Sequence, residues 1–389
     1  MKLLFVHDHP FFVDEQNNIY SGGGLPKVVW DNYLCFFSSI VVFGRYSINE
    51  KNKKVLSSGD CRCTFVLTKN FSSTKSLFIQ YGLLKKEIKK EIQDADIVLV
   101  RLPSTLGFVA AQIAKYEKKK IIVEQVGNAK EALFTHGSFL GKIAAPIFHS
   151  INKKITANAD YVVYVTRHKL QKNYPAPKAL IASISDVFIP NIISANHLNR
   201  KKFTNKILKI GLIGGFDARY KGQDILLKAV NYLPEVIKKD IELYFIGKGN
   251  YDWVLEISKQ LGLENNIKYI GPKEAGIEIF DFLEDMSIYA QPSRTEGMPR
   301  SLLEAMSRGC PVIGSNVGGI SDVVDPIFIH KSGDYLTLSK HIKLLYYDRD
   351  LLCKQAIRSI YEIQPYLKSR LDQKRKNFFS QIINNGSLT

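Results

Sequence analysis

The chain has 389 residues, of which 45% are hydrophobic and 23% charged, and its formal net charge is +17. This length exceeds one typical core and predicts two domains of an ordinary soluble globular protein. The longest apolar run is too short for a transmembrane helix, and the start, residues 1–10, is too short and too soon polar for a secretory signal. We therefore expect a cytoplasmic protein.

The distribution of charges and the positions of the cysteines indicate which partners, disulfides and metal sites to expect. Basic residues exceed acidic ones by 12 in residues 1–200 and by 5 in the rest, so a basic first half is expected to face an anionic membrane, a phosphorylated acceptor or a nucleic acid. Five scattered cysteines predict neither a disulfide nor a metal site. No cluster of histidines and carboxylates predicts a metal site elsewhere.

Along the first half, apolar β-branched runs alternate with helical patterns, which predicts a parallel sheet covered by helices. The predicted strands are Lys2–His7, Ile40–Arg45, Thr64–Thr68, Ile97–Leu102, Ile121–Val126, Tyr161–Thr166 and Leu180–Ser185. Ser21-Gly22-Gly23-Gly24 is expected to open a helix after a long loop, where a ligand could bind; the alternative is a flexible loop without a ligand. The stretch 75–93 carries an apolar stripe beside lysines, as either an interfacial helix or a surface helix packed on its own sheet would.

The polar, basic stretch Asn196–Lys206 is expected to be a linker that contributes no core. A second βα series follows it, which predicts a second doubly wound domain. Its strands are expected at Leu208–Gly214, Glu242–Gly247, Ile267–Ile270, Ser287–Ala290 and Pro311–Gly314, and its helices at Lys221–Leu233, Trp253–Leu261, Ile277–Leu283 and Pro299–Arg308. The tail from Tyr335 to Ile383 is expected to be helical. We place the domains at 1–195 and 207–365, with a terminal helix at 366–389.

Glycines and one spaced pair of glutamates mark the strand ends of the second domain. Gly214 and Gly215 follow its first strand, where the backbone can approach a diphosphate closely. In the segment Gln291–Ile313, Glu296 lies on the loop after a strand and Glu304 about two turns into the next helix. The start of that helix offers unpaired N–H groups to a phosphate. One carboxylate is placed to bind sugar hydroxyls and the other a ribose.

Segment 291–313 resembles the signature of the retaining glycosyltransferases of family 4, which have the GT-B fold of two Rossmann-like domains facing a cleft. The resemblance implies that Glu296 contacts the transferred sugar and Glu304 the ribose. Residues expected to bind the donor are Gly214, Gly215, Gly247, Gly271, Pro272, Gly297, Met298, Pro299, Arg300, Ser301 and Glu304. The family's terminal helix crosses back to the first domain, which implies the same for 366–389. The resemblance also implies that Gly22, Gly23 and Gly24 lie on the acceptor side of the cleft.

The resemblance also implies that cations neutralise the leaving diphosphate without a metal or other cofactor. Lys221-Gly222 matches the family pattern, whereas the usual arginine position is Phe216 and this chain has Arg219 instead. Arg219 either reaches the phosphate from a reshaped loop or is an exposed charge. Many members also have a histidine near the reacting carbon, where His136, Glu124 or Asn128 are the candidates here. At Asp322 the family more often has glutamate.

These observations predict a hexosyltransferase-type enzyme that moves a sugar from a nucleotide-sugar, with a UDP-sugar expected, to a hydroxyl of a glycan or lipid-linked acceptor in surface polysaccharide biosynthesis. It is expected in the cytoplasm, with peripheral contact to the inner face of the membrane. The first alternative is an inactive nucleotide-sugar-binding protein. A nucleic-acid-binding protein would explain the charge but lacks a motif, and no Gly-x-Gly-x-x-Gly follows a first strand as in a dehydrogenase.

Overall fold

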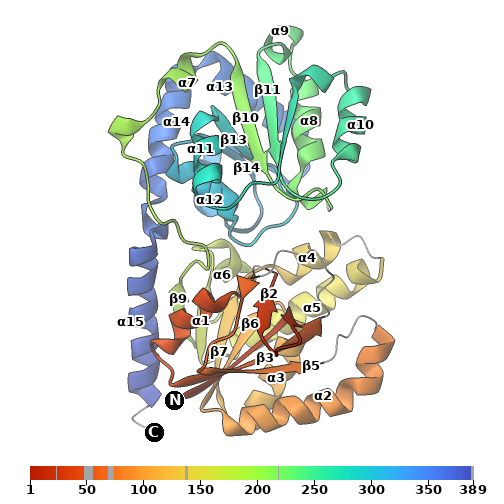
Figure 1. Ribbon diagram of the computed structural model, residues 1–389, viewed down its shortest axis with the longest axis vertical. Coiled ribbons are helices and arrows are strands. Elements are labelled where there is room, and N and C mark those ends of the chain that lie inside the picture. Colours follow the sequence, from red (N-terminus) through yellow and green to blue (C-terminus); the bar gives the residue numbers. More distant parts are fainter. Residues whose placement is uncertain (23, 48–55, 69–73, 136–138, 218, 387–389) are drawn as a thin grey trace.

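A computed structural model of the protein describes residues 1–22, 24–47, 56–68, 74–135, 139–217 and 219–386. Figure 1 shows two α/β domains stacked along the longest axis, with the terminal helix running beside the first. Each domain is built on its own sheet, and the two sheets are not hydrogen-bonded to each other. The prediction of two α/β domains is confirmed.

The first domain is built on a sheet in the order β4-β2-β1-β6-β7-β8-β9, with β3 added beside β1 and β5 beside β3. All pairings are parallel except those of β2 with β1 and β4. The central strands are apolar on both faces, as strands covered by helices must be. The strands are β1 Lys2–Val13, β2 Ile19–Ser21, β3 Ser39–Ser47, β4 Leu56–Ser57, β5 Cys63–Thr68, β6 Ile97–Leu102, β7 Lys120–Gln125, β8 Tyr161–Tyr164 and β9 Leu180–Ser183.

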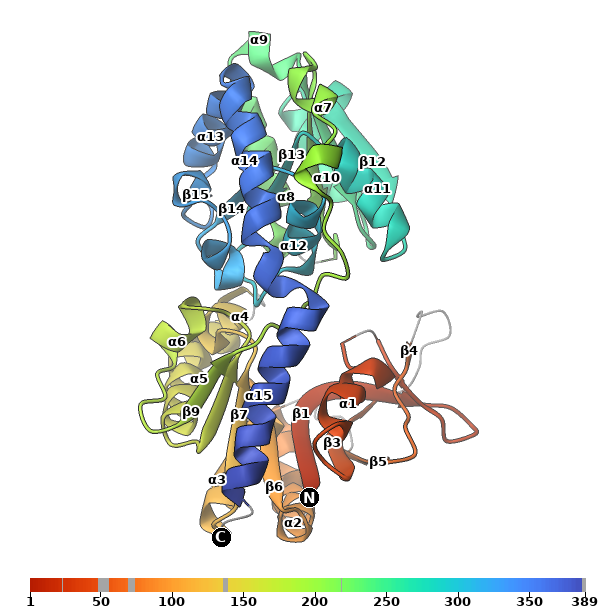
Figure 2. The same cartoon turned by 90° about the vertical axis from the view of Figure 1, so that its left-hand side faces the viewer.

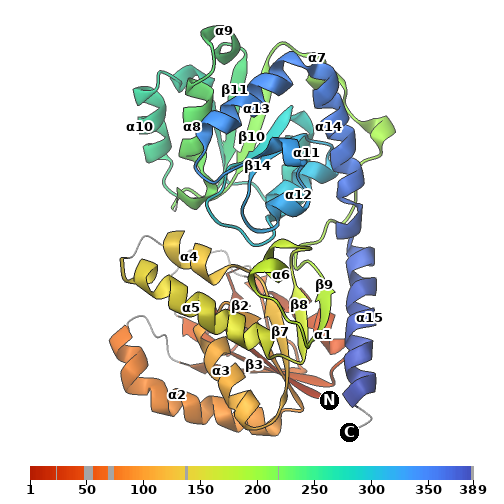
Figure 3. The same ribbon diagram turned by 180° about the vertical axis from the view of Figure 1, so that it is seen from behind.

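Helices cover both faces of this sheet. One face packs against α2 Thr74–Asp94, α3 Thr105–Tyr116 and α5 Phe139–Ala157, and the other against α1 Lys27–Leu34 and α15 Lys368–Gly386. Figures 2 and 3 show these two groups on opposite sides. The short helices α4 Ala129–Thr135 and α6 Lys169–Asn173 lie at the strand ends that face the second domain.

In the first domain one expectation changes and one open alternative is decided. The first strand runs on to Val13 after a register shift between Val6 and Pro10 and then turns back through β2, so Ser21 ends a hairpin and Gly22 and Gly24 follow it. In α2, Leu84, Ile88 and Ile92 are buried in the core, so this part of the stripe packs on its own sheet, whereas Tyr81 is 39% exposed. The exposed face of α2 carries lysines together with Leu83, which is 67% exposed.

The second domain has a parallel sheet in the order β12-β11-β10-β13-β14-β15. Helices α8, α10 and α13 pack together on one side, and α11, α12 and α14 on the other. The strands are β10 Leu208–Ile213, β11 Ile241–Ile246, β12 Ile267–Gly271, β13 Ile288–Gln291, β14 Val312–Ser315 and β15 Ile329–His330. The helices are α8 Gln223–Asn231, α9 Glu235–Lys238, α10 Asp252–Gln260, α11 Ile277–Asp285, α12 Arg300–Ser307, α13 Tyr335–Tyr347 and α14 Arg349–Glu362.

Two segments connect the domains. The stretch expected to be a coreless linker instead contains the short helix α7 Lys201–Thr204. Phe203 of this helix is buried in the core of the second domain. After α14 the chain returns to the first domain as α15, where Phe379 stacks on Phe36 with ring centroids 5.2 Å apart. α14 and α15 thus form one column along both domains (Figure 2).

Candidate active site

An ion pair between Lys221 and Glu296 lies near the carboxyl ends of β10 and β13. Nζ of Lys221 donates to Oε1 of Glu296 at 2.7 Å, and the two side chains are 13% and 8% exposed. The same oxygen accepts hydrogen bonds from Ser293 at 2.7 Å and from Gln291 at 2.9 Å. All three described bonds fall on Oε1, so the carboxylate has a fixed orientation and its second oxygen is left for a ligand.

Lys221 reaches Glu296 because the loop before α8 lies directly on the end of β13. Gly222 has φ +79°, and a β-carbon there would lie 2.1 Å from the carbonyl oxygen of Pro292, so only glycine fits. The aliphatic part of Lys221 lies against Gly214 after β10. The Lys-Gly pair and the glycine after β10 therefore act together to place one cation.

Arg294 connects the loop before α8 to the loop after β13 through hydrogen bonds. Its guanidinium makes two parallel bonds, of 2.9 and 2.7 Å, to the carboxylate of Asp224 in the first turn of α8. It also donates to the carbonyl of Arg219 at 2.5 Å, and its own N–H donates to the carbonyl of Tyr220 at 2.7 Å. The position of Lys221 thus depends on Arg294, which the sequence analysis did not single out.

The start of α12 completes this site. Pro299 precedes the helix and no side chain caps it, so the first-turn N–H groups are available to an anion. Ser301 is held by Tyr289, whose hydroxyl donates to Oγ at 2.7 Å. Glu304 is partly buried, and burial raises the pKa of its carboxyl to about 7 despite the nearby Arg300. Within the part of the chain that the structure describes, no hydrogen bond to the Glu304 carboxylate is found.

The remaining donor-side residues lie at one edge of the sheet. Gly214 and Gly215 follow β10, Gly247 follows β11, Gly271 ends β12 and Pro272 follows it. Phe216, at the family's usual arginine position, is 2% exposed and packs edge-on against Tyr251 and Tyr269. That position belongs to the core in this chain.

Arg219 lies apart from the Lys221–Glu296 pair. Its guanidinium sits 4.7 Å above the ring of Trp253, whose indole N–H donates to the carbonyl of Phe216. The side chain is otherwise exposed. The arginine is thus held by a cation–π contact at the rim of the site.

The glycine-rich donor loop touches the first domain. A β-carbon on Gly297 would lie 2.5 Å from the carbonyl oxygen of Val126, which follows β7. Asp322, in the turn after β14, accepts a bond of 2.5 Å from the N–H of Arg167 at the start of α6. The loops of Gly297 and Asp322 in the second domain therefore contact the first domain near the ends of its strands β7 and β8.

The candidate residues of the first domain lie in different surroundings. Gly22 and Gly24 follow β2, and Gly24 lies against the ring of His9. Gly23 and His136 are outside the described residues. Asn128 is engaged locally, because its Oδ1 accepts bonds from Tyr174 and the N–H of Lys130. Glu124 instead joins a charged cluster with Tyr33, Arg101 and Asp186, described below.

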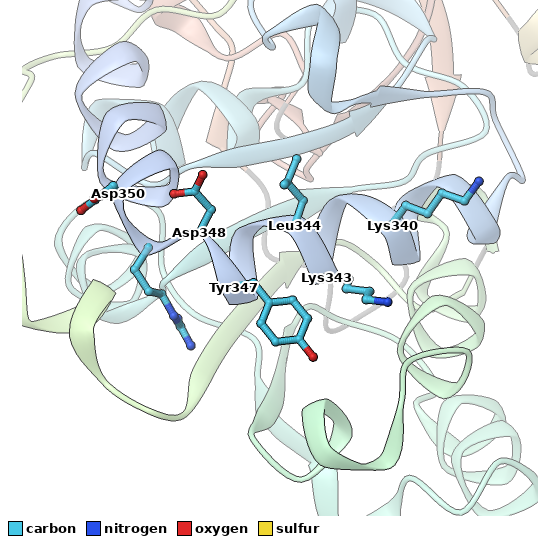
Figure 4. Close-up of a pocket in the computed structure, with 7 residues that line it drawn as sticks. Lys340, Lys343, Leu344, Tyr347, Asp348 and Asp350 are labelled. Atoms are coloured by element: carbon cyan, nitrogen blue, oxygen red, sulfur yellow. The ribbon is translucent and has the colours of Figure 1, made fainter.

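A hollow on α13 and the start of α14 has a volume of about 660 Å³. Figure 4 shows Lys343 and Tyr347 extending from the same side of α13. This hollow lies in the part of the second domain that is remote from the first domain (Figure 1). None of the predicted site residues lines it, and we place no function there.

Comparison with known proteins shows the family of the chain. The family described as glycosyl transferases group 1 matches residues 196–362. Protein CapJ of Staphylococcus aureus is 32% identical over 355 residues, covering 91% of this chain and 88% of CapJ. The capsular polysaccharide biosynthesis glycosyltransferase CapH of the same species is 27% identical over 58% of each chain.

Solved structures show the same fold. Sucrose-phosphate synthase from Thermosynechococcus elongatus superposes with a TM-score of 0.69 at 13% identity and covers 99% of this chain and 100% of its own. HepE from Anabaena, solved in complex with UDP-glucose, gives 0.64 at 17% identity, covering 98% and 100%. These neighbours are GT-B glycosyltransferases, so the predicted GT-B fold is confirmed.

Proposed function

Since the chain belongs to the group 1 glycosyltransferases, we propose that it is a retaining, metal-independent enzyme. It transfers a sugar from a nucleotide-sugar, a UDP-sugar in the first instance, to a hydroxyl of a glycan or lipid-linked acceptor. The observation that carries the proposal is the Lys221–Glu296 pair beside the uncapped start of α12. A fixed cation and free N–H groups at one place suit a leaving diphosphate.

In the proposed reaction the bond between the anomeric carbon and the diphosphate oxygen breaks while Lys221 and the N–H groups of α12 stabilise the departing charge. The acceptor hydroxyl forms its bond to the same carbon from the same face, and its proton passes to a phosphate oxygen. The configuration is thereby kept. Glu296 binds the sugar hydroxyls through its second carboxylate oxygen, and Glu304 accepts bonds from the ribose.

Arg219 has a smaller proposed part in the same step. From its position over Trp253 it contributes a second positive charge at the rim of the diphosphate site. Its exposure allows solvent to screen that charge more strongly than the charge of Lys221. We therefore assign the main stabilisation of the leaving group to Lys221.

The biological setting is proposed from the relatives. CapH is named for capsular polysaccharide biosynthesis, and we extend a role in surface polysaccharide assembly to this chain. In the described part of the chain, no helix is both long enough and apolar enough to cross a membrane. We propose a cytoplasmic protein whose exposed α2 lysines, such as Lys85 and Lys89, touch the inner face of an anionic membrane. Sedimentation with phosphatidylglycerol vesicles, lost at high salt, tests this contact.

The experiment for the reaction uses a panel of UDP-, GDP- and ADP-sugars in EDTA, with NMR to follow the anomeric configuration of the released sugar. We expect slow hydrolysis of one donor with retained configuration. Inverted product would contradict the retaining mechanism, and activity only after adding a divalent metal would contradict metal independence. Binding without hydrolysis or transfer would favour an inactive nucleotide-sugar-binding protein.

A further inference from the structure

A cavity of about 640 Å³ opens between α1 and α15 on one face of the first sheet. Its volume is within the range of small-molecule sites. From the second domain, Arg300 and Ala275 also line it. Val126, whose carbonyl lies against Gly297 of the donor loop, is two residues beyond Glu124 on the cavity wall. The cavity therefore adjoins the site where the donor sugar is proposed to react.

Three charged side chains gather at one end of the cavity. Arg101 lies between two carboxylates: Nη2 is 2.6 Å from Oδ2 of Asp186, and Nε is 3.5 Å from Oε2 of Glu124. Arg101 and Glu124 are only 11% and 13% exposed. These residues come from the ends of β6 and β7 and from the turn after β9, so their positions are fixed by the sheet.

Glu124 keeps room for one more hydrogen bond. The hydroxyl of Tyr33 donates to its Oε1 at 3.0 Å, and its Oε2 is buried beside Nε of Arg101, at 3.5 Å, without a hydrogen bond in the described structure. Because burial closes Oε2 to a ligand, a ligand hydroxyl would be accepted by Oε1, which has a second lone pair. The side chain of Asp186 is 31% exposed and offers a second carboxylate to the same ligand.

The other walls carry apolar and charged side chains. On α15, Asp372 is bonded to both Lys368 and Arg375, so this wall offers more hydrogen-bond donors than acceptors. On α1 and β4, Val28 and Leu56 are 50% and 49% exposed. Such a mixture of paired charges and apolar surface suits a hydroxylated ring, whose edge forms hydrogen bonds and whose faces are C–H groups.

We propose that this cavity binds the acceptor sugar as a neutral hydroxylated ring, with Glu124 and Asp186 accepting its hydroxyl protons in hydrogen bonds and Arg101 fixing both carboxylates. The inference rests on the proposed glycosyltransferase function. It adds that the terminal helix α15 forms one wall of the acceptor site, so the crossover contributes to substrate recognition as well as to packing.

The test measures binding of p-nitrophenyl glycosides of glucose, galactose, N-acetylglucosamine and N-acetylgalactosamine by saturation-transfer NMR, with UDP present at saturation. We expect at least one of these probes to bind. Glu124→Gln should weaken it about tenfold, because a charged acceptor is lost. Val28→Trp, which fills the cavity from an exposed position, should weaken it at least tenfold. Val236→Trp on α9, which is 71% exposed and far from the cavity, is the matched control.

The outcomes separate the two proposals. UDP binding in every folded variant, with glycoside binding lost only in Glu124→Gln and Val28→Trp, supports the acceptor cavity. UDP binding without any glycoside binding to the wild-type protein would overturn it and leave the proposed function standing. Equal binding to wild type and Val28→Trp would also overturn it, whatever the folding of Glu124→Gln. Absence of UDP binding by the wild-type protein would contradict the proposed function itself.

Discussion

Glu296 in the second domain and Glu124 in the first both lie near the carboxyl ends of parallel strands, yet the chain satisfies them to different degrees. Glu296 accepts three hydrogen bonds on one oxygen and is held ready for a ligand. Glu124 accepts one, from Tyr33, and its other oxygen is buried beside Arg101 without a hydrogen bond. The proposed donor side thus holds its carboxylate with three bonds, whereas the proposed acceptor side leaves room for a bond from the ligand. Changes on each side should therefore affect different measurements.

The largest effect is expected from Lys221→Ala. It removes the cation at the proposed leaving group and one of the three donors to Glu296, so turnover should fall by about 10²-fold to 10³-fold. Glycoside binding in the acceptor cavity should be unchanged. Lys228→Ala, an exposed lysine on α8, is the control. Comparable turnover of the Lys221→Ala and Lys228→Ala variants would contradict the role assigned to Lys221.

Arg294→Ala should have the next largest effect, although its proposed role is only to position Lys221. Loss of the paired bonds to Asp224 frees the loop before α8, and a displaced cation should lower turnover roughly thirtyfold. The fall should appear in kcat more than in the affinity for UDP. Arg294→Lys should recover only part of the activity, because lysine cannot make both bonds. Full recovery would mean that the charge alone matters.

The pKa of about 7 for Glu304 predicts a pH-dependent donor affinity. If the ionised carboxylate accepts the ribose hydroxyls, affinity rises as pH increases through 7, by about tenfold between pH 6 and pH 8. Titration calorimetry with the preferred nucleotide-sugar measures this. Glu304→Gln should flatten the profile, and a slope that persists in this variant would assign the effect to another group.

Arg219→Ala should have the smallest effect. The guanidinium is exposed over Trp253, and we expect turnover to fall only a few-fold, with a dependence on ionic strength that Lys221→Ala does not share. A fall as large as that of Lys221→Ala would show that Arg219 reaches the diphosphate when the donor binds. Kinetics at low and high salt distinguish the two results.

The difference between the proposed donor side and the proposed acceptor cavity also explains which residues could be predicted from the sequence. The donor-side residues belong to short local motifs, Gly214-Gly215, Lys221-Gly222 and the segment around Glu296, so they could be predicted before the fold was known, and the apolar runs located the main strands. Arg294 was missed although it lies in the same loop, because its partner Asp224 is 70 positions away and only the packed loops reveal the pairing. In the acceptor cavity, Arg101, Glu124 and Asp186 come from separate strand ends, and α15 joins them from the far end of the chain.

Errors arose where burial overrides composition. Phe203 lies among lysines, so its segment was predicted to be a coreless linker, yet the ring is buried in the second core. The stripe on α2 was left open between a membrane-facing and a sheet-facing helix, since both present the same periodicity. Only the packing of Leu84, Ile88 and Ile92 on the sheet decides between them.

The central claim is that Lys221 and Glu296 act on one transition state, and a double-mutant cycle on turnover tests it most directly. Donor turnover in EDTA would be measured for the wild type, Lys221→Ala, Glu296→Gln and the double variant, with UDP binding as the control for folding. We predict that each single variant is slowed at least about 10²-fold and that the double variant is little slower than the slower single variant, because residues acting as a unit are not additive. Wild-type turnover in either single variant, or fully multiplied losses in the double variant, would contradict the account.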